Sequence, residues 1–491
     1  MTPEWALALA VLMPLAAIVP ISLTGRSPNL RETVTLATAV ATFLVVFRLL
    51  PPVLSGQRPS IVLAEPFPGL PLVFELEPLG MIFALVASFL WIATSVYSIG
   101  YMRGHGEENQ TRFYAFFALA IASALSVAFA GNMLTLFVAY EVLSVSTYPL
   151  VTHAGTQEAR RAGRLYLGIL MGSSIGLQLL AIVWTWTLTG SLDFRDGGIL
   201  AGKADGGIAA ALLALYVFGI GKAAVMPLHR WLPAAMVAPT PVSALLHAVA
   251  VVKAGVFAVL KVCVYIFGLD MLSGLDASHW LLAAAVFTII VGSLVAMTAD
   301  NLKRRLAYST ISQLSYIVAG ALLATGLSIT GAAMHIAMHA FGKITLFFCA
   351  GAILVAAHKD RVSQLDGLGR TMPWTMAAFF VGSLSIIGLP PAGGTWSKFY
   401  LMLGALEAGE AWVAGILMLS SLLSIWYLLE IPARAFFVRP ADEPHGGEAP
   451  VTCLLAIGLS AAGTVALFVW PDVLYRLAAA VATTPGWRTL P

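Results

Sequence analysis

Three lysines and one histidine lie in the two apolar runs of residues 219–262, on either side of a Pro-rich segment between Pro227 and Pro241. The cations are Lys222, Lys253 and Lys261, and His247 lies between the first two. An ammonium group is costly in hydrocarbon, so a membrane segment that contains several is a candidate for ion or proton handling. Lysine suits this chemistry because it can release its proton when it is desolvated, whereas arginine effectively cannot.

A second set of titratable groups follows helical spacing. His335, His339 and Lys343 stand at i, i+4 and i+8 in MHIAMHAFGKITLFFCAG. On a helix these positions form one stripe with steps of about 6 Å. Such a file predicts a proton relay through bridging water. A metal site is less favoured, because no carboxylate or cysteine nearby adds a ligand to the two histidines.

A third feature is an interrupted apolar run, IIGLPPAGGTWSKFYLM, in which Pro390, Pro391, Gly393 and Gly394 precede Lys398. Helices that break inside a membrane are tolerated where the freed backbone is buried in protein or lines a wet cavity. At the other break, Lys222 lies just before Pro227. The sequence therefore predicts two broken spans, each bearing a lysine.

Only one carboxylate, Glu141, is expected deep in an apolar run, while Glu430 is placed near the cytoplasmic end of another. A lone buried carboxylate would be protonated or paired, and we expect it to pair with a buried lysine. The resulting polar axis would run from Glu141 through Lys222, and then through His247 or Lys253. It would continue through His335, His339 and Lys343 to Lys398. Movement of Lys222 from Glu141 toward the centre would drive the next proton onward by charge repulsion.

Composition indicates a polytopic membrane protein. Of 491 residues, 59% are hydrophobic and 10% are charged, whereas a soluble domain has about 25% charged residues. The formal net charge of +3 is too small to indicate a nucleic-acid partner. The three cysteines form no disulfide framework. No Walker loop or GxGxxG motif is present, so we expect neither a cofactor nor a metal.

Fourteen spans are predicted from runs of about 20 apolar residues, giving an all-α membrane protein. The connection 51–78 has room for a small hairpin outside the membrane. The first run lacks a basic leading segment, so it is expected to be a retained helix rather than a signal peptide. The predicted spans are 5–23, 31–50, 79–101, 113–130, 132–152, 165–190, 207–228, 241–268, 280–299, 306–325, 329–356, 374–404, 411–431 and 451–471.

The distribution of Lys and Arg predicts the orientation. One set of alternate loops has sixteen of these cations, from Arg26 to Arg439, and the other has six, namely Arg48, Arg58, Arg195, Lys203, Arg476 and Arg488. The first side is therefore expected to be cytoplasmic, with both termini outside. The remaining five cations fall inside predicted spans and are all lysines: Lys222, Lys253, Lys261, Lys343 and Lys398. Lys261 either snorkels from the outer end of its helix or joins the buried set.

The two broken spans, the seventh and the twelfth, are five spans apart, and paired interruptions of this kind point to inverted repeats. Spans 4–8 and 9–13 would be the two five-helix repeats. The chain then divides into N-terminal helices (1–112), a first repeat (113–268), a second repeat (269–435) and a C-terminal helix (436–491).

Several of these motifs together resemble the antiporter-like subunits shared by Mrp cation/proton antiporters and respiratory complex I. They are KAAVMPLHRWLPAAMVAPTPVSALLHAVAVVKAG, MHIAMHAFGKITLFFCAGAI, LDGLGRTMP and IGLPPAGGTWSKFYL. The resemblance covers roughly residues 79–435 and is strongest to the MrpD component of the Mrp systems. It implies fourteen helices, a half-channel in each inverted repeat and assembly with other membrane subunits. It also implies that Glu141, Lys222, Lys253, His339, Lys343 and Lys398 carry the protons. Ala234 departs from the family pattern, which often has Asp there.

The resemblance implies a proton-translocating subunit of a multisubunit Na⁺(K⁺)/H⁺ antiporter in a bacterial cytoplasmic membrane. One alternative is a proton-pumping subunit of complex I (NADH:quinone oxidoreductase) or of a membrane-bound hydrogenase, as part of a translocase but with no redox site of its own. Another is an energising subunit for inorganic-carbon uptake, and a third is a structural scaffold. Glu141 with Ser144 and Ser146 could also supply oxygen ligands to Na⁺. The sequence leaves the roles of Lys261 and Glu430 open.

Overall fold

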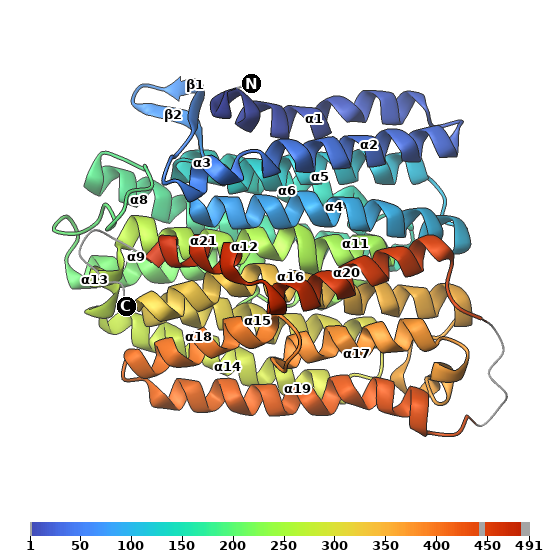
Figure 1. Ribbon diagram of the computed structural model, residues 1–491. Helices are drawn as coiled ribbons and strands as arrows, with labels where there is room; N and C mark the ends of the chain where they lie inside the picture. The colour runs from blue at the N-terminus through green and yellow to red at the C-terminus, as the bar shows by residue number, and fades with distance from the viewer. Residues whose placement is uncertain (1, 441–446, 483–491) are drawn as a thin grey trace.

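Nearly all of the apolar runs form helices that lie side by side in one bundle (Figure 1). The computed structural model describes residues 2–440 and 447–482. Within these residues, 12 helical stretches are long and apolar enough to cross a membrane. They are Pro3–Leu23 (α1), Pro28–Leu54 (α2 Pro28–Phe47 and α3 Leu50–Leu54), Pro78–Gly104 (α4), Gln110–Ala128 (α5), Met133–Val151 (α6), Gln157–Thr189 (α7 Gln157–Ser173 and α8 Leu179–Thr189), Thr240–Phe267, Asp276–Thr298 (α14), Leu302–Leu323 (α15), Gly326–Ala357 (α16), Ala411–Phe437 (α19) and Val451–Val469 (α20).

The other two predicted spans are interrupted helices, as the sequence indicated. The seventh contains α9 (Gly206–Gly219) and the 3-10 turn Gly221–Ala223, followed by α10 (Trp231–Ala234) and a second 3-10 turn, Ala235–Val237. The twelfth is divided into α17 (Pro373–Ile387) and α18 (Gly394–Glu407). Each of the fourteen predicted spans thus corresponds to a helix or a helix pair, which confirms the all-helical polytopic fold.

The stretch Thr240–Phe267 is the central strut of the bundle, because its whole apolar window is buried inside the protein. It is not a uniform α-helix. It consists of α11 (Thr240–Ala244), a π turn at Leu245–Val249, α12 (Val251–Lys261) and a second π turn at Val262–Phe267. A π turn in a helix often marks a functional position. His247 lies in the first of these turns, and Lys253 lies in α12.

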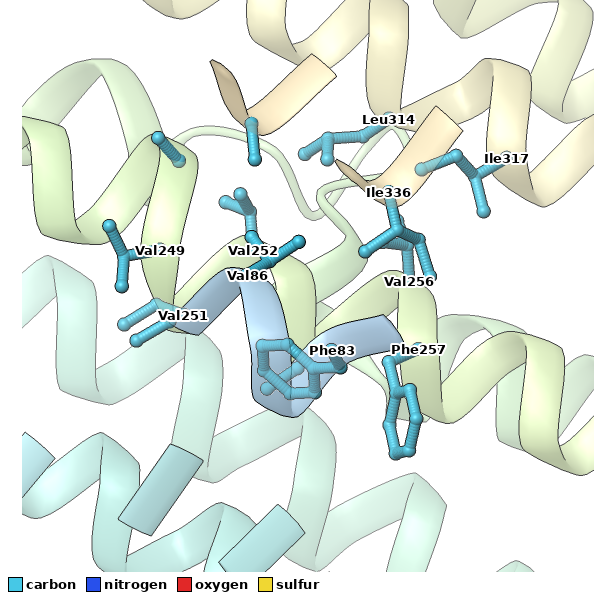
Figure 2. Close-up of a cluster of buried hydrophobic side chains, with 14 of the residues drawn as sticks. Phe83, Val86, Val249, Val251, Val252, Val256, Phe257, Leu314, Ile317 and Ile336 are labelled. Carbon is cyan, nitrogen blue, oxygen red and sulfur yellow. The ribbon is translucent and has the colours of Figure 1, made fainter. Parts of the chain in front are cut away.

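The core around this strut is apolar. Figure 2 shows side chains from four helices meeting there, among them Phe83 of α4, Val252 and Val256 of α12, Leu314 of α15 and Ile336 of α16. All of them are essentially inaccessible to solvent. Polar groups on these helices are therefore held in a low-dielectric surrounding, where they must find partners within the protein.

A short antiparallel hairpin, β1 (Ser60–Phe67) and β2 (Leu70–Glu75), lies at one end of the bundle (Figure 1), within the connection predicted to hold one. It is attached to the α5–α6 loop, because Glu75 N donates to Phe129 O at 2.7 Å and Gly131 N to Val73 O at 2.9 Å. The remaining short helices are α13 (Leu269–Ser273) and α21 (Asp472–Ala482), with 3-10 turns at Val362–Gln364 and Leu368–Arg370.

Other features of the prediction are not tested by the fold. The inversion of the two repeats, the division into four parts and the placement of both termini outside stay predictions. Residues 441–446 and 483–491, which belong to the predicted C-terminal part, and Arg488, which entered the charge comparison, lie outside the described residues.

Candidate functional site: a buried file of lysines and histidines

Lys222 lies in the 3-10 turn at the break of the seventh span and is completely buried. Its Nζ donates to Tyr140 O at 2.8 Å and to Ser144 Oγ at 2.6 Å, both on α6. The same nitrogen lies 3.1 Å from the centre of the Tyr140 ring, a cation–π geometry. The carbonyl of Gly221, at the break, accepts from Trp231 Nε1 at 3.0 Å and from Ala224 N at 3.0 Å. Polar groups at the break thus find hydrogen-bond partners inside the protein, as backbone groups within a membrane must.

Glu141 follows Tyr140 on α6, but it does not pair with Lys222. Both carboxylate oxygens are buried and have no hydrogen-bond partner among the described residues, and no ion pair within 4.0 Å joins them to a cation there. The expected Glu141–lysine pair is therefore wrong for this conformation. Ser144, considered as a ligand for Na⁺, is instead bonded to the ammonium group of Lys222. The Lys222 ammonium group is thus bonded to two oxygens of α6 and not to the Glu141 carboxylate.

We predict that Ser144→Ala will slow transport about 10-fold or more. A hydrogen bond to a charged group contributes about 1.5–3 kcal/mol, and its loss would leave the Lys222 ammonium group with one fewer oxygen in a buried site. The matched control is Ser146→Ala, because Ser146 Oγ bonds only to Leu143 O of its own helix. Equal transport rates for the two variants in reconstituted vesicles would show that Ser144 does not hold the lysine.

The centre of the site is a contact between two helices. Lys253 Nζ of α12 lies 2.5 Å from His339 Nδ1 of α16, and both residues are buried. The His339 and His335 rings are 5.6 Å apart, one helical turn from each other. An ammonium group can only donate, so a protonated Lys253 would donate to His339 Nδ1 across this contact, with the imidazole proton on Nε2.

The file continues from His335 to the second broken span. His335 Nδ1 lies 2.8 Å from Ser397 Oγ, and Ser397 immediately precedes Lys398 on α18. The His335 ring stacks on Tyr316 with 5.8 Å between the ring centres. Lys398 Nζ lies over the same Tyr316 ring at 4.7 Å. Lys253, His339, His335 and Lys398 thus lie one after another in a file, with Ser397 and Tyr316 as added members, whereas the predicted order ran through His335, His339 and Lys343 to Lys398.

Two predicted members lie beside this file. Lys343 is buried on α16 but donates to Ser309 Oγ at 2.6 Å and to Leu306 O at 3.3 Å, toward α15. His247 is buried, its ring centre is 4.5 Å from that of Phe347, and neither ring nitrogen has a hydrogen-bond partner in the described part of the chain. The i, i+4, i+8 stripe thus holds for the two histidines, whereas the flexible lysine side chain bonds to the neighbouring helix.

Lys398 is held by the second break. Its Nζ donates to Ile387 O at 3.1 Å and to Ser421 Oγ of α19 at 3.0 Å. Ile387 ends α17, so its carbonyl is one that an unbroken helix would have used. Gly388 follows with φ +92°, a left-handed conformation that favours glycine. A side chain at Gly388 would also approach Lys398 Cδ to 2.7 Å.

We predict that Gly394→Ala will destabilise the second break by at least about 1–3 kcal/mol, the usual cost of overpacking. A Cβ at Gly394 would overlap with Ser385 O, so α18 would have to move away from α17. Gly415→Ala is the matched control, because a Cβ there meets nothing within 4 Å. Thermal unfolding in detergent measures both, and similar midpoints would contradict the prediction.

A fully buried ion pair lies apart from the file. Lys261, at the end of α12, is 0% exposed and its Nζ lies 3.1 Å from Glu77 Oε1. It also donates to Ala130 O at 2.6 Å. Tyr265 OH donates to Glu77 Oε2 at 3.2 Å. The snorkelling interpretation of Lys261 is therefore wrong. Sequence reasoning missed Glu77, because it lies at the edge of a span and was assigned to a loop.

Glu430, whose role the sequence left open, belongs to a network at the opposite end of the bundle. Arg305 Nη1 donates to Glu430 Oε2 at 2.7 Å, and Arg434 lies 3.5 Å from the same carboxylate. Arg434 Nε also donates to Asp366 Oδ1 at 2.8 Å. The network joins α15, α19 and the loop after α16, so it fixes the ends of these helices and is separate from the file.

Comparison with known proteins places the chain in a family. Residues 130–424 match the family model described as NADH:quinone oxidoreductase/Mrp antiporter, TM. The chain is 35% identical over 382 residues to NADH-quinone oxidoreductase subunit N of Desulforudis audaxviator, covering 77% of this chain and 75% of that protein. It is 33% identical over 354 residues to hydrogenase-4 component B of Escherichia coli, covering 69% of this chain but only 51% of that protein.

Two solved structures share the fold. A chain of the Mrp complex from Dietzia sp. superposes with a TM-score of 0.88 at 24% identity, with 98% of this chain and 97% of that chain covered. A chain of the archaeal membrane-bound sulfane sulfur reductase superposes with a TM-score of 0.84 at 23% identity, with coverage of 97% and 96%. The match of the family model over most of the chain, together with these relatives, shows that the protein belongs to the NADH:quinone oxidoreductase/Mrp antiporter family of membrane subunits.

Proposed function

We propose that this chain is the proton-translocating, MrpD-like member of a multisubunit Mrp-type Na⁺(K⁺)/H⁺ antiporter in a bacterial cytoplasmic membrane. The observation that carries the proposal is the buried file Lys253–His339–His335–Lys398, which joins the central strut to the second broken span. Titratable side chains are costly inside a membrane, and where they occur they commonly mark the path of an ion or a proton.

Proton movement along the file follows from its contacts. A proton arriving at Lys253 is shared across the 2.5 Å contact with His339 Nδ1. His339 then releases a proton from Nε2 through a bridging water to His335, whose Nδ1 faces Ser397. Lys398, next to Ser397, receives it at the second broken span. Each step converts a cation to a neutral group as the next group becomes charged.

Lys222 controls loading of the file from the first repeat. In the observed state it is held by Tyr140 and Ser144 and separated from Glu141. No hydrogen bond between described residues links Lys222 directly to Lys253. Transfer between them therefore uses water that enters when Lys222 moves. Return of Lys222 to Glu141 removes positive charge from the centre and allows Lys253 to be protonated again.

Assembly with other membrane subunits is supported by the surface at both ends of the site. The outward face of α6 exposes Val138, Val142 and Val145 beside Glu141. Near Lys398, α19 exposes Leu422 and Trp426. Such apolar surface can face lipid or a neighbouring subunit, and the relatives and solved structures described above are named as parts of multisubunit membrane complexes.

A proton-pumping role in a complex I-like or hydrogenase-like assembly is the second candidate, because the relatives described above include a quinone oxidoreductase subunit and a hydrogenase component. The test is to purify the assembly from its native host through a tag on this chain, identify the partners and reconstitute it. Proton uptake driven by a Na⁺ or K⁺ gradient, with six or seven small membrane subunits, supports the antiporter. Iron–sulfur or flavin subunits, with proton movement only during electron transfer, support the second candidate.

A further inference from the structure

An apolar groove on the outer surface of the bundle reaches the back of the helix that carries the histidines. It has a volume of about 330 Å³ and lies between α2, α4, α16, α20 and α21. Phe43, Phe89 and Leu467 line its walls, and Ala337 and Phe341 of α16 also line it. These two positions are about 200° around the helix from His335 and His339. The groove therefore contacts the face of α16 opposite the proton file.

A polar pocket adjoins the groove. It has a volume of about 250 Å³ and is lined by Gln57, Arg58 and Arg476, together with apolar residues. Leu477 of α21 lines both the pocket and the groove, so the two lie next to each other and share a wall. Figure 1 shows α21 continuing from α20 toward the end of the bundle that carries the hairpin. Among the residues that the structure describes, no carboxylate lines the pocket.

The charge in this pocket is positive. Arg58 is compensated by Asp196, whose two oxygens both accept from Arg58 Nη2 at 2.8 Å. Arg476 is exposed and takes part in no ion pair with the described residues. One guanidinium charge is thus left over beside an apolar groove. The groove is also lined by Trp470, which is 72% exposed, an aromatic of the kind found near lipid headgroups.

We propose that this groove binds one anionic phospholipid, with an acyl chain against α16 and its phosphate between Arg476 and Arg58. An apolar slot on a membrane-facing surface fits an acyl chain. A basic pocket at the end of such a slot fits an anionic headgroup. A neutral lipid would leave the Arg476 charge uncompensated. A protein helix would need an apolar surface along its whole length, and the arginine pocket does not offer one.

A lipid in the groove would support the packing of α16 on the face opposite His335 and His339. An acyl chain in the groove fills space next to Phe341, whose ring already contacts Phe89 with 5.6 Å between centres. Its loss would leave the α16 helix less tightly packed on the side opposite His335 and His339. The lipid would therefore act as a positioning ligand and would touch none of the proton-carrying groups.

The test measures lipid occupancy by native mass spectrometry. The assembly containing the full chain is delipidated in mild detergent and titrated with phosphatidylglycerol and, separately, with phosphatidylcholine. The wild type is expected to retain one phosphatidylglycerol in preference to phosphatidylcholine. Arg476→Gln should weaken phosphatidylglycerol binding about 5-fold, since one arginine contributes about 1 kcal/mol to an anionic lipid. Ala466→Phe, which fills the groove, should reduce binding of both lipids.

Two controls isolate the site. Arg48→Gln changes an arginine of the same predicted side that lines neither cavity, and Ala462→Phe adds a ring at an exposed position of α20 outside the groove. Both should bind as the wild type does. Equal affinity for the two lipids, or no change in Arg476→Gln, would overturn the proposal. So would an assembly that binds no phosphatidylglycerol although the isolated chain does, because a protein partner would then fill the groove. Occupancy is measured without transport, so this test is independent of the proposed function.

Discussion

Replacing Lys253 by methionine is expected to slow proton translocation by about 10²–10⁴-fold, the range for loss of a positioned proton-transfer group. Methionine has a similar length and suits the apolar cluster around α12, so the bundle should still fold. The variant leaves His339 Nδ1 without the partner now 2.5 Å away. The measurement is proton uptake into vesicles that contain the reconstituted assembly, followed with a pH-sensitive dye.

The matched control is Lys203→Met, which removes a lysine from an exposed loop position where its Nζ bonds only to Thr189 O. It should transport at the wild-type rate. A Lys253→Met variant that is correctly assembled but transports within about 3-fold of the wild type would exclude the file as the proton route. His339→Gln adds a second check, because glutamine retains hydrogen bonding but does not accept and release a proton at neutral pH.

The largest expected effect on stability comes from Lys261→Met, which should lower the free energy of unfolding by about 3–5 kcal/mol. Removing one partner of a buried ion pair leaves the other charge uncompensated. Glu77 would keep its bonds from Leu79 N at 2.5 Å and Gly80 N at 2.9 Å, through which it caps α4, and would lose its cation. Unfolding in a denaturing detergent or by heat measures the loss.

The double variant Glu77→Gln/Lys261→Met separates charge from packing. A glutamine side chain at this position can retain part of the capping role without a charge, so the double variant should be more stable than Lys261→Met alone. Lys359→Met, in a loop between α16 and α17, controls for a change in net charge. A loss below about 1 kcal/mol in Lys261→Met would be the behaviour of a snorkelling lysine and would contradict the buried pair.

The sequence was sufficient for features that depend on local pattern. Hydrophobic length defines the spans, Pro and Gly define the two breaks, and helical spacing places His335 and His339 one turn apart on one face. These properties depend on backbone geometry over a few residues, and the long apolar runs leave few competing interpretations. The lysines of both broken spans were predicted for the same reason.

Features that depend on tertiary packing were beyond the sequence. Lys253 meets His339 only because α12 packs next to α16, and Lys343 turns to Ser309 because a flexible four-carbon side chain selects the nearest oxygen. His247 has the residue type of a proton carrier but lies against Phe347. The serines and tyrosines that bond to the buried lysines and histidines could not be identified from the sequence, because these residue types are common in membrane helices.

The attachment of the hairpin has a mechanical consequence for α6. Besides its backbone bonds to the α5–α6 loop, the hairpin has two hydrogen bonds to the start of α6. Asn132 Nδ2 donates to Pro71 O at 2.7 Å, and Val73 N donates to Thr135 Oγ1 at 2.9 Å. The first turn of α6 is therefore clamped, while Pro149 weakens its last turns. With its first turn fixed in this way, any tilt of α6 would have its pivot at the hairpin. Tyr140 and Ser144, farther along the helix, would then move sideways more than the first turn does.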